Sequence, residues 1–196
     1  TVGAMTDGYT PEDPSDDALA SFSSAGPTHE GFVKPEVVAP GGHMLGLVST
    51  DSMLAQTYPD FYQSDKYFEM SGTSQATAVV SGIAALALQA EAWRSVDQLK
   101  CKIMSAANPA VNPDGTLAYS IFQQGAGLVN ALDAVYSSAS GCANVGLDVD
   151  LDLAGVPQVA PVEAGRDDVH VGHRALEVLG QGGGHPHHQG EVGEAA

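Results

Sequence analysis

The chain has 196 residues, of which 43 % are hydrophobic, and its formal net charge is −17. This length is enough for one modest domain. The acidic balance argues against a nucleic-acid partner, which requires a basic surface. We also expect no membrane partner, because no apolar run of about 18 residues is present.

Composition divides the chain near Tyr136. All six Tyr, all five Phe and the single Trp lie at or before this residue. Beyond Ala154 the sequence is rich in Gly, Ala, Val and Pro, and it contains five histidines, His170, His173, His185, His187 and His188. We therefore predict a folded unit over residues 1–137 and an acidic, Gly/His-rich, disordered tail over residues 138–196. A metal-binding role for the tail is an alternative, although no spacing fixes a set of ligands.

Four segments have the apolar or alternating pattern of strands: Thr1–Met5, Leu19–Ser23, Val37–Ala39 and Leu45–Thr50. The continuous apolar run at Val37–Ala39 is typical of a buried parallel strand. The acidic residues 7–17 include Gly8, Pro11 and Pro14, which predicts a surface loop. Residues 51–66 predict a second, longer loop, which holds three aromatic side chains.

The most informative stretch surrounds Ser74. A short strand with Tyr67 and Phe68 leads into Gly72-Thr73-Ser74, and Gln75–Ala90 is then apolar except for four polar side chains. This pattern predicts a buried helix with Ser74 in its first turn. The N–H groups there are unpaired, so Ser74 is placed to attack a carbonyl whose oxyanion meets its own N–H. Taken alone, a Ser before an apolar run predicts only a helix N-cap.

Two features of this helix and the next can be predicted from single residues. Gly82 costs about 0.8–1 kcal/mol relative to Ala in a helix interior, and we expect a neighbouring strand to approach it closely. Ser95 and Gln98 form a capping box, which predicts a second helix with Leu99, Ile103 and Met104 facing inward. Asn108-Pro109 ends that helix.

The rest of the chain predicts three further elements. Leu117–Phe122 is expected to be extended, and Gly127–Ser137 is expected to form a last helix with Leu128, Leu132 and Val135 on one face. The alternation of Asp and apolar residues at 148–153 predicts one more strand.

Three further blocks accompany the Ser74 stretch: Ala20–Pro27, Lys34–Gly41 and Gly125–Ala131. In this order and spacing the four blocks resemble the C-terminal part of the catalytic domain of subtilisin-like serine proteases, over about Thr1 to Tyr136. The resemblance implies an α/β fold, part of a three-layer arrangement with a mostly parallel sheet, and Ser74 as the catalytic nucleophile. The family usually has Met directly after the nucleophile and Pro four positions after it, where this chain has Gln75 and Ala78. Neither change removes the hydroxyl.

The resemblance implies a secreted serine endopeptidase that hydrolyses protein or peptide substrates through an acyl-enzyme on Ser74. A structural calcium ion is an expectation from the family alone, and no other cofactor is identifiable. The family's catalytic His and Asp and its oxyanion Asn belong to blocks that are absent here, and His29 and His43 match none of them. We therefore expect the upstream part of the same catalytic domain to supply these groups and the isolated chain to be inactive. Without that part, the strand at Thr1–Met5 would present an unpaired edge. The alternative is a non-catalytic, subtilase-like binding module.

Two cysteines, Cys101 and Cys142, are too few for a disulfide framework and lie in no metal or redox motif. One interpretation is a pair of free buried thiols. The other, from the exported context of the family, is a disulfide that joins the second helix to the segment after the last one.

Overall fold

The computed structural model describes residues 1–10, 12–63, 66–142, 150–151 and 154. Most of the predicted tail at 138–196 and most of the predicted strand at 148–153 lie outside these residues. The elements in chain order are β1 (Val2–Thr6), a 3₁₀ helix at Pro14–Asp16, β2 (Ala18–Leu19), β3 (Val37–Pro40), β4 (Met44–Leu47), α1 (Met53–Thr57), a 3₁₀ helix at Pro59–Phe61, β5 (Tyr62–Gln63), β6 (Tyr67–Met70), α2 (Thr73–Ala90), α3 (Val96–Ser105), α4 (Ile121–Gln124) and α5 (Ala131–Tyr136).

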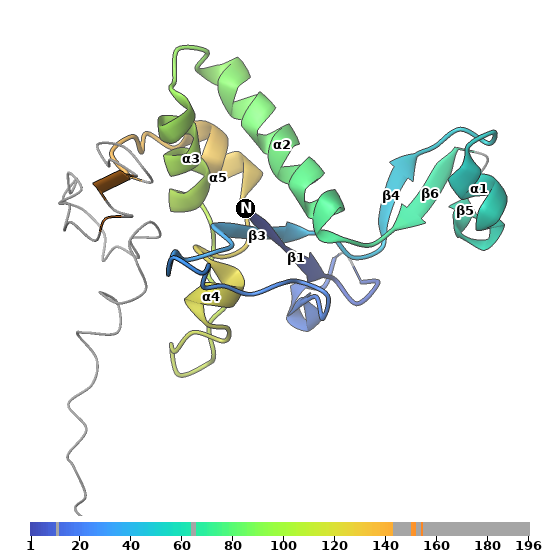
Figure 1. Ribbon diagram of the computed structural model, residues 1–196, viewed down its shortest axis with the longest axis horizontal. Helices are drawn as coiled ribbons and strands as arrows, with labels where there is room; N and C mark the ends of the chain where they lie inside the picture. The colour runs from blue at the N-terminus through green and yellow to red at the C-terminus, as the bar shows by residue number, and fades with distance from the viewer. Residues whose placement is uncertain (11, 64–65, 143–149, 152–153, 155–196) are drawn as a thin grey trace, which may run out of the picture.

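The body of the molecule is an α/β unit around a mixed sheet of order β2-β1-β3. β1 pairs with β3 in parallel, from Val2 opposite Val37 to Met5 opposite Pro40, and it pairs with β2 antiparallel. Helix α2 packs on β1 and β3, while α3 and α5 pack against α2 (Figure 1). The predicted α/β class is therefore observed, with β1–β3 as the parallel pair.

Small side chains allow α2 to lie close to this sheet. One buried cluster holds Ala4, Ala20, Ala39 and Ala76, and the second holds Val37, Ile83, Ile103 and Ala134. The prediction of a buried helix is met on one face only: Ala76, Ile83 and Ala87 are buried, whereas Leu86 on the opposite face is 51 % exposed. The expected strand beside Gly82 is also not found there, since a Cβ added at Gly82 would meet nothing within 4 Å.

The predicted unpaired edge at β1 is covered by the chain itself. Ala20 donates its N–H to the carbonyl of Ala4 at 2.9 Å, and Ala4 donates its N–H to the hydroxyl of Ser23 at 3.0 Å. The strand predicted at Leu19–Ser23 is shorter than expected, because β2 ends at Leu19. The residues after it, Ala20 and Ser23, nevertheless form hydrogen bonds with the backbone at the edge of β1.

A second, antiparallel sheet of order β4-β6-β5 stands apart from the body (Figure 1). With α1 and the 3₁₀ helix at Pro59–Phe61 it forms a unit that we call the arm, residues 44–70. The prediction of one long loop over 51–66 is wrong, because the Ser52 hydroxyl accepts the N–H of Ala55 at 3.1 Å and starts α1. The arm packs on itself through Phe68, which is buried and lies beside Phe61.

The observed bounds of the C-terminal helices agree with the prediction at some residues and differ from it at others. The capping box of Ser95 and Gln98 starts α3, as predicted. Instead of an extended segment up to Phe122, Ser120 and Gln123 form another capping box and start α4. The last helix begins at Ala131 rather than Gly127, because the Asn130 side chain caps it.

Gly127 belongs to a segment that runs beside β3. Val38 donates its N–H to the carbonyl of Gly127, and Val129 donates its N–H to the carbonyl of Val38, both at 2.9 Å. The predicted inward face of the last helix is wrong as a result: Leu128 precedes the helix, and Leu132 is 67 % exposed. Ala134 is the buried residue of α5.

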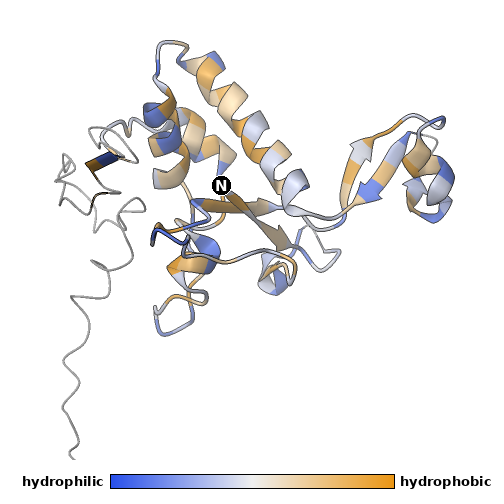
Figure 2. Cartoon of the chain, in the orientation of Figure 1, coloured by the Kyte–Doolittle hydropathy of each residue, from blue (hydrophilic) through white to orange (hydrophobic). Residues whose placement is uncertain are grey.

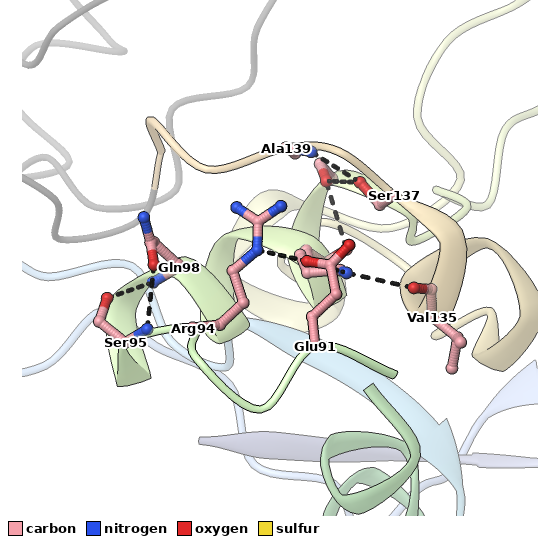
Figure 3. Close-up of polar contacts among 9 residues, drawn as sticks. Glu91, Arg94, Ser95, Gln98, Val135, Ser137 and Ala139 are labelled. Carbon is pink, nitrogen blue, oxygen red and sulfur yellow. Dashed lines mark hydrogen bonds and ion pairs between the residues drawn. The ribbon is translucent and has the colours of Figure 1, made fainter. Parts of the chain in front are cut away.

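A disulfide and the contacts of a buried lysine hold the C-terminal helices together. Cys101 of α3 is bonded to Cys142, with a Cα–Cα separation of 5.0 Å, so the disulfide interpretation is the one observed. Lys102 is fully buried; its Nζ donates to the carbonyl of Val135 at 3.1 Å and lies 3.2 Å from Oε2 of Glu91. Figure 3 shows the side chain of Arg94 directed at the carboxylate of Glu91, to which its Nε–H donates at 2.5 Å. Hydrogen bonds from Arg94 and Lys102 hold the pKa of Glu91 below its usual value.

Candidate active site

Ser74 is the second residue of α2, at the point where the chain passes from β6 into the helix. Gly72 occupies the N-cap position without a side-chain cap, and its carbonyl accepts the N–H groups of Gln75 and Ala76 at 3.1 and 3.3 Å. Thr73 begins the helix, and its carbonyl accepts the hydroxyl of Thr77 at 2.8 Å. The hydroxyl of Ser74 is thus presented at a helix N-terminus, where the sequence predicted it.

Two backbone N–H groups at this turn have no acceptor within the described part of the chain. Within the described residues, the N–H groups of Thr73 and Ser74 have no acceptor, and the Ser74 hydroxyl has no hydrogen-bond partner. Ser74 is also exposed. An exposed hydroxyl beside unpaired N–H groups at the positive end of a helix can place a carbonyl carbon at the oxygen and its developing oxyanion at the N–H.

Gly41 positions the turn from the opposite side. Its carbonyl accepts the N–H of Gly72 at 2.8 Å, and a Cβ on Gly41 would lie 2.8 Å from the carbonyl oxygen of Gly72 and 3.1 Å from the Cβ of Ala76. Only glycine permits this approach. The glycine of the Lys34–Gly41 block therefore acts on the Ser74 turn, a role that its sequence position alone does not show.

Gln75, which follows the candidate nucleophile, folds back over the turn. A Cβ built on Gly72 would lie 2.8 Å from Oε1 of Gln75, and Nε2 of Gln75 donates to Sδ of Met70 at 3.7 Å. The side chain at this position therefore links the first turn of α2 to the end of β6.

His43 lies beside the turn, but its ring is directed elsewhere. Its backbone N–H donates to the hydroxyl of Ser71 at 2.9 Å, while its ring stacks on Tyr9 with 3.6 Å between ring centroids. No sequence signal marks this contact, because a backbone N–H is common to nearly every residue. In the described part of the chain, no histidine or carboxylate is hydrogen-bonded to Ser74. Among the described residues, the candidate nucleophile and the unpaired N–H groups beside it therefore have no base hydrogen-bonded to them.

The described residues bring no three His, Cys, Asp or Glu side chains into a group that fits a metal ion. In the acidic loop, burial, followed by repulsion from Asp16, Asp7 and Asp13, raises the pKa of Asp17. None of the helices in the described ranges is long and apolar enough to cross a membrane.

Comparison with known proteins gives the family. The profile of the subtilase family matches residues 1–127. The chain is 38 % identical over 135 residues to serine protease AprX of Bacillus subtilis, and this alignment covers 69 % of this chain and 29 % of AprX. It is 39 % identical over 124 residues to bacillopeptidase F of the same organism, covering 63 % of this chain and 8 % of that protein. The chain therefore spans less than a third of the length of either relative.

The fold is similar to that of fervidolysin from Fervidobacterium pennivorans, a keratinolytic enzyme related to subtilisin. The TM-score is 0.52 at 24 % identity, over 72 % of this chain and 19 % of fervidolysin. The fold, the turn at Ser74 and the family match agree, and the chain belongs to the subtilase family of serine proteases.

Proposed function

We propose that this chain is the C-terminal portion, residues 1–137 followed by a tail, of the catalytic domain of a serine endopeptidase in which Ser74 is the nucleophile. The observation that supports this most is the turn at Ser74, where an exposed hydroxyl lies beside two unpaired N–H groups at the start of α2. The family match and the relatives that are proteases by name support the same reaction class.

In the proposed reaction a base removes the proton of Ser74 Oγ as this oxygen attacks the scissile carbonyl. The tetrahedral oxyanion is held by the N–H of Ser74 and by a side-chain donor, and collapse gives an acyl-enzyme and releases the amine. Water then hydrolyses the ester. On this proposal the base His, the orienting Asp and the oxyanion Asn come from a segment that precedes Thr1, and protein or peptide chains are the substrates.

We further propose an extracytoplasmic location. The Cys101–Cys142 disulfide supports it, because such bonds persist in oxidising compartments. One relative, Vpr of Bacillus subtilis, is named a minor extracellular protease.

The proposal is tested with a fluorophosphonate, which labels only an activated serine. The isolated chain should not react, whereas the chain supplied with its upstream segment should be labelled at Ser74. In subtilisin, loss of the catalytic His alone lowers kcat by about 2 × 10⁶-fold, or roughly 8–9 kcal/mol of barrier.

Ser74→Ala should abolish labelling, and Ser81→Ala is the matched control, because Ser81 lies on the same helix with its hydroxyl bonded to the carbonyl of Thr77. Loss of labelling in both variants would contradict a specific role for Ser74. Absence of labelling in the complete protein would favour the alternative, a subtilase-like binding module without catalysis.

A further inference from the structure

Within the described residues, one face of the arm is uncovered and carries exposed apolar side chains. β4 alternates in exposure, so Leu45 and Leu47 project from the same face and are 55 % and 75 % exposed. Tyr67 lies opposite Leu47 in β6 and is 41 % exposed. In Figure 2 most of β4 has the colours of hydrophobic residues, whereas β6 beside it includes a hydrophilic segment. The other face is already occupied, because Phe68 is buried there beside Phe61. The arm is thus packed on one side and offers an apolar surface on the other.

The edge of the same sheet is unpaired. β4 is an outer strand of the order β4-β6-β5. Val48 donates its N–H to the carbonyl of Lys66 at 3.0 Å, so Val48 and Gly46 point toward β6, and the N–H and C=O groups of Leu45 and Leu47 point away from it. Within the described residues nothing is hydrogen-bonded to these outward groups. Unpaired backbone groups beside apolar side chains are the surface used when an extended peptide adds a strand.

This edge begins next to the candidate nucleophile. Two hydrogen bonds join the base of the arm to the Ser74 turn: Gly72 N–H to the carbonyl of Gly41, and His43 N–H to the hydroxyl of Ser71. β4 then leads away from the turn into the arm (Figure 1). An extended chain whose carbonyl is at Ser74 therefore meets the start of the edge within a few residues.

We infer that the free edge of β4 binds an extended, apolar segment of the polypeptide substrate next to the scissile bond, as an added strand. This inference rests on the endopeptidase function proposed above. The added strand would cover Leu45 and Leu47, and at the outer end of β4 it would meet an open surface depression lined by Leu47, Val48, Ser49, Thr50, Tyr62 and Lys66.

The negative charge of the chain favours a neutral or basic peptide at this edge. The chain has a formal net charge of −17, and Glu69 lies opposite Leu45 on the exposed face, where it accepts a hydrogen bond from Gln63 at 3.0 Å. A second copy of the chain brings the same large negative charge and is repelled. An apolar segment that is neutral or basic, with no acidic residue beside Glu69, fits the surface better.

The test measures binding of a fluorescent peptide to the 196-residue chain by anisotropy. The peptide alternates Val and Thr and ends in Lys. Leu47→Pro removes one outward N–H from the edge, a position at which strands tolerate proline, and Leu47→Lys keeps the backbone but makes the face polar. Leu132→Lys is the matched control, because Leu132 is an exposed leucine on α5. Both Leu47 variants should raise Kd about tenfold, and the control should leave it unchanged.

A spin label on either end of the peptide shows where the peptide lies. One of the two labels should broaden the amide signals of Ser74 and Met70. No measurable binding, equal weakening in the Leu132 control, or no broadening at Ser74 with either label would overturn the inference. Dimerisation that the peptide cannot displace and that Leu47→Pro abolishes would assign the edge to a second copy instead.

The outcomes also separate this inference from the proposed function. Peptide binding does not require a reactive serine, so Ser74→Ala should bind normally. Fluorophosphonate labelling of the complete protein without peptide binding refutes the docking edge alone. Peptide binding without labelling refutes the endopeptidase and, with it, the identity of the bound segment as substrate.

Discussion

Nε2 of Gln75 donates a hydrogen bond to the thioether sulfur of Met70 at 3.7 Å, so a methionine lies beside the candidate nucleophile although none directly follows it. Replacing the family's usual Met by Gln75 removes one oxidisable group from the turn. The structure shows that a second one remains, on the strand that leads into it.

We predict that peroxide damage at this turn falls on Met70. The sulfoxide is larger and polar, and accommodating it between β4 and α2 should cost about 1–3 kcal/mol, as overpacking does. Met70→Leu should therefore keep the melting temperature of the chain after peroxide treatment, while Gln75→Met should lose more than the unaltered chain. Mass spectrometry of the Met70 peptide checks the site, and an unoxidised Met70 at the point where stability is lost would contradict the prediction.

The ion pairs of Glu91 with Arg94 and Lys102 predict acid sensitivity. The pKa of Glu91 is lowered in the folded chain, so its contribution is fully present above the carboxyl pKa of the unfolded chain and is lost as pH falls through the folded value. We expect the melting temperature to fall between neutral and acidic pH. Glu91→Gln should lower it at neutral pH and flatten this dependence, because Lys102 is then buried without its counter-charge.

The control for this measurement is Asp60→Asn, which removes an exposed carboxylate of the arm. It should leave the pH dependence unchanged. A Glu91→Gln variant that retains the full acid sensitivity would show that other carboxylates dominate it.

Reduction of the Cys101–Cys142 disulfide should destabilise the chain. The bond closes a loop with a sequence separation of 41, and constraint of the unfolded chain gives at most about 4 kcal/mol for such a loop. Denaturant midpoints with and without a thiol reductant measure the effect. The double variant Cys101→Ser, Cys142→Ser should show the lower midpoint under both conditions. A midpoint that the reductant does not change in the unaltered chain would exclude a stabilising bond.

Two glycines should respond to alanine in opposite directions. Gly127 has φ 112°, and a Cβ there would lie 2.3 Å from the carbonyl of Asn108, so Gly127→Ala should cost at least about 1–3 kcal/mol. Gly82 lies in α2 with open space around it, so Gly82→Ala should stabilise the isolated chain by about 0.8–1 kcal/mol. Urea denaturation measures both, and a destabilising Gly82→Ala would contradict the open environment of that position.

The elements that the sequence predicted well are those with a long or strongly marked pattern. The largely apolar segment of α2 is 18 residues long, which is typical of a helix and too long for a strand. The start of α3 is marked by the capping box of Ser95 and Gln98. The short helices were missed or misplaced because four to six residues hold too little periodicity. Single polar side chains, such as Ser52 and Asn130, start them.

The candidate site shows the same division. A side-chain hydroxyl before an apolar run placed Ser74 in a first turn, and the structure has it there. The contacts of Gly41 and His43 with that turn were not predictable, because they are made by backbone groups at residues distant in sequence. The cover over the edge of β1 was missed for the same reason, since it uses one backbone N–H and the hydroxyl of Ser23.

The hydrogen bond from Gly72 to Gly41 joins the chain just before the arm to the chain just after it. A segment whose ends already meet can change in length at little cost, because loop-closure entropy grows only slowly with chain length. The segment between these two glycines can therefore be replaced, in evolution or in engineering, by segments of different length and composition. Such replacements should change which polypeptides bind to the arm, while the geometry at Ser74 stays the same.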